Sequence, residues 1–207
     1  MYSQTYLLLQ NEGHLLNGCI RSALRALLVS SSAERGPLYV ALFNYSIGLE
    51  RLLKLSLILD HCVAHEGQFP TQKEIKDFGH DLVALHKRAL SICDRYKVQV
   101  PENRTTDEID KRLIQLLSGF ARSGRYFNLD GLTGGGRSED PLPEWGQILW
   151  AIYERDVPEL KRISNEEQVE AATDMMKPNT CHIPATDFDG TEQSFDDFCA
   201  DHERSAL

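Results

Sequence analysis

The sequence lacks the features that mark membrane, secreted and disulfide-stapled proteins. No apolar run reaches the roughly 18 residues that a membrane-spanning helix needs. The 5 cysteines are odd in number and widely spaced, which does not suit a disulfide framework and favours a reducing compartment. Residues Met1 to Gln4 carry no charged side chain, so we expect no secretory signal. Together these absences predict a cytoplasmic protein without a membrane segment.

The sequence also lacks the short motifs of common enzyme and metal sites. It has no Gly-x-Ser-x-Gly nucleophile turn, no Cys-x-x-Cys and no His-Glu-x-x-His. His61 and His65 are spaced to share one helix face, but no such motif accompanies them. The glycine run at 134–136 lacks the Lys-Ser/Thr of a phosphate loop, so we interpret it as a linker. We therefore expect no metal and no cofactor.

The net charge of -9 lies entirely in the last part of the chain. Residues 166–207 carry 11 acids and 2 bases, whereas residues 1–165 are formally neutral. A neutral body counts against a strongly basic nucleic-acid surface. The composition thus divides the chain into a body over 1–165 and an acidic, flexible tail over 166–207. Phe188, Phe195 and Phe198 among these acids suit docking on a basic protein partner, although an acidic tail can also serve solubility alone.

The body has the periodicity of helices. Apolar residues at helical spacing predict a first helix of about 25 residues, a second from Leu38 to about Val63, a third from His80 to about Tyr96 and a later one ending near Ser123. Strand-like alternation is confined to Val98–Val100. The side chains expected to be buried in the second helix are Leu42, Phe43, Ile47, Leu52, Leu53, Leu57 and Ile58. The fold class that follows is all-α.

Local signals set several helix boundaries. Thr71–Glu74 and Thr105–Glu108 have the pattern of capping boxes, in which Thr and Glu side chains satisfy each other's backbone amides. The segment Arg125–Pro143 is predicted to be irregular. A last helix is predicted from Pro143 to Ile163, kinked or split by Pro158 because proline cannot donate an amide hydrogen bond.

Two segments carry a family resemblance. Ala41–Lys54 is an aromatic- and alanine-rich stretch ending in Glu-x-x-x-Lys, and Gly79–Leu85 places His-Asp-Leu at a helix start. This combination resembles the HEPN domain (higher eukaryote and prokaryote nucleotide-binding) over roughly residues 5–125. The resemblance implies an up-and-down helical bundle, a homodimer, and nucleotide or RNA as possible ligands. It makes Glu50, Lys54, His80 and Asp81 candidate ligand-binding residues.

The same residues also have a purely structural interpretation. Glu50 and Lys54 are four apart and can pair on one helix face. Asp81 stands where a helix N-terminus favours a carboxylate. Both interpretations stay open on the sequence alone.

Catalytic proteins of the HEPN family are often metal-independent ribonucleases with an Arg, four to six residues, then His. No arginine of this chain has a histidine at that spacing, and Asp130 stands near the expected position after Arg125. A carboxylate cannot replace imidazole as an acid near neutral pH without a large pKa shift, and it repels phosphate. We therefore expect a non-enzyme. The alternative is a ribonuclease with a rearranged site, using Arg125 with His80 or His86.

The segment Arg125–Asp130 is the second candidate site. Its candidate ligand-binding side chains are Arg125, Tyr126, Asn128 and Asp130, a set suited to phosphate, nucleotide or peptide. The structural alternative is that Arg125 caps the preceding helix while Phe127 and Leu129 enter the core.

These patterns predict a HEPN-like binding or regulatory module that lacks the ribonuclease motif. The resemblance suggests a bacterial defence or toxin–antitoxin setting. The alternatives are the rearranged ribonuclease and a nucleotide or small-ligand sensor.

Overall fold

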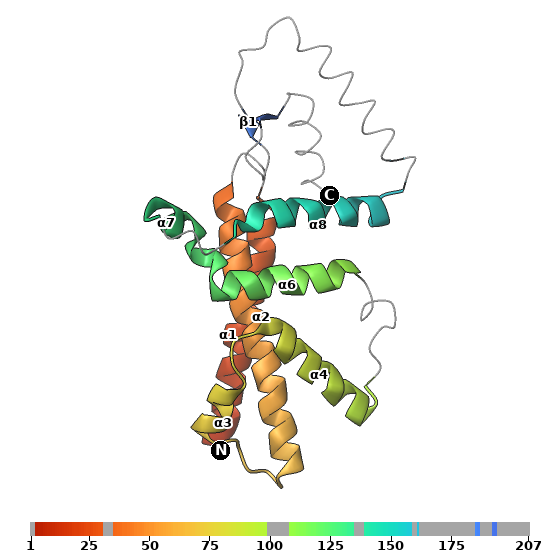
Figure 1. Ribbon diagram of the computed structural model, residues 1–207. Helices are drawn as coiled ribbons and strands as arrows, with labels where there is room; N and C mark the ends of the chain where they lie inside the picture. Colours follow the sequence, from red (N-terminus) through yellow and green to blue (C-terminus); the bar gives the residue numbers. More distant parts are fainter. Residues whose placement is uncertain are drawn as a thin grey trace, which may run out of the picture.

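The computed structural model describes residues 3–30, 35–98, 108–134, 139–158, 161, 185–186 and 192–193. Figure 1 shows how the helices are arranged. They are, in chain order, α1 (Gln4–Leu27), α2 (Arg35–Ala64), α3 (Gln72–Asp77), α4 (Leu82–Tyr96), α6 (Glu108–Arg122), the 3-10 turn η1 (Gly124–Tyr126), α7 (Phe127–Leu132) and α8 (Pro141–Asp156). The all-α bundle predicted from the sequence is confirmed.

The two longest helices, α1 and α2, form a hairpin against which the other helices are arranged (Figure 1). The two helices approach closely at Gly48, where an added Cβ would lie 3.0 Å from Ile20 Cγ1 and 3.2 Å from Cys19 Cβ. Nearby, an Arg51 guanidinium nitrogen on α2 lies 2.5 Å from Glu12 Oε1 on α1. A glycine contact and an ion pair thus hold the hairpin together in its middle.

The core lies where α4 and α6 pack on α2 and on each other, and where α8 packs on α6. In Figure 1, α6 and α8 run across the hairpin, whereas α4 descends beside α2. The buried cluster includes Leu38, Leu42, Leu53, Leu57, Leu82, Leu85, Leu116, Leu117, Phe120, Leu142, Trp145 and Ile148. At the far end of α4, Arg95 anchors the helix to α2 through a 2.7 Å ion pair with Asp60.

The prediction of buried residues in the second helix was wrong at two positions. Leu42, Leu53 and Leu57 are buried and Ile47 and Ile58 are partly buried, but Phe43 and Leu52 are 43% and 40% exposed. Periodicity showed that the segment is a helix, but it overestimated the width of the buried face.

The first of the two predicted capping boxes is confirmed. Thr71 Oγ1 accepts a hydrogen bond from the Glu74 amide at 3.3 Å, and Glu74 Oε2 accepts one from the Thr71 amide at 2.7 Å. These two bonds complete the predicted capping box. The second box, at 105–108, has three of its four residues outside the described part of the chain.

The last helix differs from its prediction at both ends. It begins earlier, at Pro141, because Asp140 caps it by accepting from the Leu142 amide at 3.0 Å and Pro141 suits a first turn. It ends at Asp156, because Val157 adopts the extended backbone that a following proline favours. The predicted break at Pro158 is confirmed, since α8 ends just before it and Lys161 beyond it is again helical. Residues 162–163 lie outside the described part of the chain.

The segment predicted to be irregular, Arg125–Pro143, is partly helical. It contains most of η1, all of α7 and the start of α8. Thr133 closes α7, because its Oγ1 donates to the Leu129 and Asp130 carbonyls at 3.0 and 3.2 Å. The glycine-rich composition of this segment gave no sign of η1 and α7, which are short and whose hydrogen bonds span only three or four residues.

The predicted acidic tail over 166–207 lies largely outside the described residues. Within it, Ala185–Thr186 pairs in antiparallel fashion with Glu192–Gln193. The division of the chain after residue 165 stays a prediction. A search of the described helices for a stretch long and apolar enough to cross a membrane found none.

Candidate functional site

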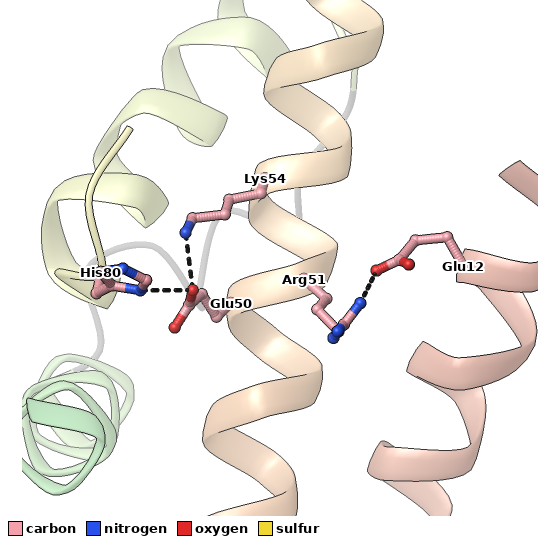
Figure 2. A network of polar contacts seen from close by, with 5 residues as sticks. All are labelled: Glu12, Glu50, Arg51, Lys54 and His80. Atoms are coloured by element: carbon pink, nitrogen blue, oxygen red, sulfur yellow. Dashed lines mark hydrogen bonds and ion pairs between the residues drawn. The ribbon is translucent and has the colours of Figure 1, made fainter. Parts of the chain in front are cut away.

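Three of the four candidate residues Glu50, Lys54, His80 and Asp81 meet in one polar network, drawn in Figure 2. Successive turns of α2 present Glu50 and Lys54, and the turn between α3 and α4 presents His80. Glu50 Oε1 lies 2.8 Å from Lys54 Nζ and 2.9 Å from His80 Nδ1. Gly79 shapes that turn with a φ of 72°, a conformation that side chains rarely adopt. The network therefore joins the start of α4 to the middle of α2.

The electrostatics of the network keep its carboxylate ionised. Burial raises the pKa of Glu50, but the hydrogen bonds and positive charges of Lys54 and His80 outweigh burial and hold the pKa below its ordinary value. The side chains of Glu50 and Lys54 are 23% and 19% exposed, whereas that of His80 is 76% exposed. A carboxylate held in this way stabilises cations and is poorly suited to donate a proton at neutral pH.

Asp81 holds the N-terminus of α4 and joins it to α6. Its Oδ1 accepts from the amides of Val83 and Ala84 at 2.9 and 3.2 Å. It also accepts from the hydroxyl of Ser118 at 3.1 Å, and Ser118 in turn accepts from the Leu82 amide at 3.1 Å. The Ala84 amide bond is the largest influence on Asp81 and lowers its pKa. Since Ser118 is fully buried, this set of bonds stabilises the α4–α6 junction.

The second candidate site, Arg125–Asp130, is built on η1 and α7. The Arg125 guanidinium carbon lies 5.0 Å from the centre of the Tyr126 ring, within the range of a cation–π contact. Asn128 hydrogen-bonds the hydroxyl of Tyr39 at the start of α2, where burial raises the Tyr39 pKa more than this bond lowers it. The contacts described for Arg125 and His80 involve different partners, so the structure joins no Arg125–His80 pair.

The structural alternative for this segment is wrong in two respects. Arg122, and not Arg125, bonds the end of α6, donating from Nε to the Ser118 carbonyl at 3.3 Å. Leu129 is 60% exposed and does not enter the core. Of the apolar side chains of α7, Leu129 and Leu132 are exposed, whereas Phe127 is partly buried.

The structure contains a cleft that the sequence did not predict. It measures about 690 Å³ and lies between α6 and the segment that enters α8. Arg112 and Arg122 line it from α6, and Glu139, Asp140 and Glu144 line it from the other side. No local motif indicates it, because its walls are separated by the glycine-rich segment.

The described residues were the place to look for metal-ligating groups of side chains, including the pair His61 and His65. Among the described residues, no three His, Cys, Asp or Glu side chains are grouped to hold an ion. His61 and His65 stack face to face with ring centres 3.9 Å apart, and His65 Nδ1 is 2.9 Å from the His61 carbonyl. The pair therefore packs as a stack at the C-terminal end of α2.

Comparisons of this chain with protein-family models, with curated proteins and with solved structures found no match.

As pH falls, the free energy of unfolding of Glu50→Gln is expected to decrease less than that of the wild type. Because the folded-state pKa of Glu50 lies below its ordinary 4.5, its ionised form stabilises the fold above that pH. That contribution is lost as pH falls through the lowered value. We expect the variant to lose about 1 kcal/mol near neutral pH, since solvent screens the His80 side of the network. In acid its free energy of unfolding should converge on that of the wild type.

Urea titrations at a series of pH values measure this convergence. The control is Glu154→Gln, an exposed α8 position with no polar contact among the described residues. It removes the same charge outside the network. A difference between wild type and Glu50→Gln that stays constant down to about pH 3 would contradict the predicted linkage.

Proposed function

We propose that this protein is a HEPN-like binding or regulatory module that does not cleave RNA. The observation that carries the proposal is how its family-like polar residues are used. Glu50, Lys54 and His80 bond one another, and Asp81 bonds the start of α4 and Ser118. These contacts support a structural role for the motif that resembles the family.

The charge at the expected catalytic position points the same way. Asp130 stands near where the ribonuclease motif would have histidine. Metal-independent RNA cleavage, in which the ribose 2'-hydroxyl attacks the phosphate and the 5'-oxygen leaves, needs an acid or base that titrates near neutral pH and a cation near the phosphate. Arg125 can supply the cation, but the described contacts bring no imidazole to it. Binding without cleavage is the function that this arrangement supports best.

The test is incubation of the purified full-length protein with single-stranded RNA in the presence of a chelator. We expect no cleavage by the wild type, and the same result from Arg125→Ala. Metal-independent cleavage that disappears in Arg125→Ala and His80→Ala, but persists in Arg21→Ala, would instead establish the rearranged ribonuclease. Arg21 is a suitable control because it is an exposed arginine on α1, far along the chain from both candidate residues.

The homodimer and the protein partner of the acidic tail are part of this proposal. Both rest on the family resemblance and on the composition of residues 166–207. Exposed apolar side chains along the hairpin, among them Leu8, Leu15 and Leu59, are compatible with an interface.

A further inference from the structure

The C-terminal part of α1 presents a stripe of basic and apolar side chains to solvent. The stripe consists of four residues at intervals of three and four along the helix, which places them on one face: Arg21, Leu24, Arg25 and Leu28. All four are exposed, Leu24 at 51% and Leu28 at 80%. Among the described elements, α1 packs chiefly on α2. The four residues, the α1 stripe, are therefore left uncovered by the other helices.

The positive charge of the α1 stripe is available to an acidic ligand. Among the described residues, neither Arg21 nor Arg25 has a polar side-chain partner. Glu12 is the one acid in the sequence of α1, and it already pairs with Arg51 on α2. The C-terminus of a helix carries roughly half a negative charge, which opposes only part of the charge of two arginines. The stripe therefore favours a ligand that combines carboxylates with apolar side chains.

This combination occurs in the acidic part of the same chain. Residues 195–198 read Phe-Asp-Asp-Phe, so two aromatic side chains flank two carboxylates. Residues 166–207 as a whole carry 11 acids and 2 bases. The segment and the α1 stripe thus each have two apolar and two charged side chains, and the charges are of opposite sign. Such complementarity favours association and fixes which surfaces meet.

The chain that follows α8 is long enough to bring the segment to α1. The 23 residues 162–184 precede the paired strand Ala185–Thr186. Fully extended, 23 residues span at most about 76 Å. The 24 residues of α1 are only about 36 Å long. Because both surfaces belong to one chain, they meet at an effective concentration of about 1 mM, so even a weak contact is populated.

From this complementarity we propose that the segment Phe195–Phe198 docks on the α1 stripe of its own chain. Its two carboxylates pair with the two arginines, and its two aromatic rings cover the two leucines. The inference rests on the proposed function, in which the acidic tail docks on a basic protein surface, and it names that surface. A separate protein partner of the tail must then displace it from α1.

A fluorescein-labelled peptide of residues 187–203 is the probe, and fluorescence anisotropy follows its binding to the full-length protein. In the wild type, the chain's own tail competes with the peptide for α1. The tail variant, Phe195→Ser/Phe198→Ser, removes the aromatic contacts of that competitor. With an effective concentration of about 1 mM and a dissociation constant of about 0.1 mM, we expect the tail variant to bind the peptide about tenfold more tightly than the wild type.

Two further pairs of substitutions, made in the tail variant, locate the contact. Arg21→Gln/Arg25→Gln should weaken peptide binding at least about fivefold, because two solvent-screened ion pairs are lost. Glutamine has nearly the helix propensity of arginine, so α1 should be retained, which circular dichroism checks. Lys73→Gln/Lys87→Gln is the charge-matched control, since both lysines are exposed and lie on α3 and α4. We expect that control to leave the peptide affinity unchanged.

Three outcomes would overturn the inference. They are equal peptide affinity of the wild type and the tail variant, equal weakening by the arginine and lysine substitutions, and competition that appears only at high protein concentration. The last result would place the tail on a second copy of the chain. None of these outcomes depends on RNA cleavage. Cleavage that requires Arg125 would overturn the proposed function while leaving the contact between the tail and α1 intact, so the two failures are distinguishable.

Discussion

Leu117→Ala is expected to lower the free energy of unfolding by roughly 2–5 kcal/mol, the largest effect predicted for a single substitution here. Leu117 is 1% exposed and belongs to the core cluster where α6 meets α2 and α8. The truncation removes apolar contacts and leaves a cavity that the surrounding helices fill only in part. For a chain of this length the loss corresponds to a decrease of roughly 5–15 °C in melting temperature.

Thermal and urea unfolding followed by circular dichroism measure this loss. Leu132→Ala provides the matched control, because Leu132 undergoes the same truncation but is 85% exposed at the end of α7. We expect its free energy of unfolding to stay within about 0.5 kcal/mol of the wild type. Equal effects of the two substitutions would mean that α6 does not form the core described here.

Gly48→Leu is expected to destabilise the protein by about 1–3 kcal/mol, because it overpacks the contact between α1 and α2. Even a Cβ at this position would lie 3.0 Å from Ile20 Cγ1, closer than ordinary van der Waals contact. The larger side chain forces the helices apart along the hairpin. The improved helix propensity, worth about 1 kcal/mol relative to glycine, offsets only part of the cost.

Gly18→Leu separates helix propensity from packing. Gly18 lies within α1, and no heavy atom comes within 4 Å of its Cβ position. The same substitution there should leave stability unchanged or raise it by up to about 1 kcal/mol. Chemical denaturation of both variants tests the pair. Gly48→Leu as stable as Gly18→Leu would show that α1 and α2 do not approach closely at Gly48.

The sequence allowed accurate prediction where the physical cause is local. The capping box at Thr71 and the cap at Asp81 join groups within two or three residues of each other, so their patterns are visible in the chain. The ion pair between Glu50 and Lys54 has the same origin, because a separation of four residues brings side chains together on any helix.

Prediction was weaker where the cause is non-local. Phe43 and Leu52 have the apolar character of core residues, but the fold leaves each of them exposed to solvent. His80 bonds Glu50 although the two residues are 30 apart in sequence. The family resemblance singled out both residues, but it did not predict the bond between them. The cleft is the clearest case, since Arg122 and Glu139 become neighbours of one cavity only after α6 and α8 have packed.

By itself, the sequence determined the helical class, several helix boundaries and the concentration of the net charge of -9 in residues 166–207. These properties follow from composition and from interactions within about one helical turn. Only the tertiary structure decided which face of α2 is buried, that His80 shares the Glu50 carboxylate, and that acids and arginines surround a cleft. The reason is that burial and charge pairing between helices depend on how distant segments cross, which local periodicity does not specify.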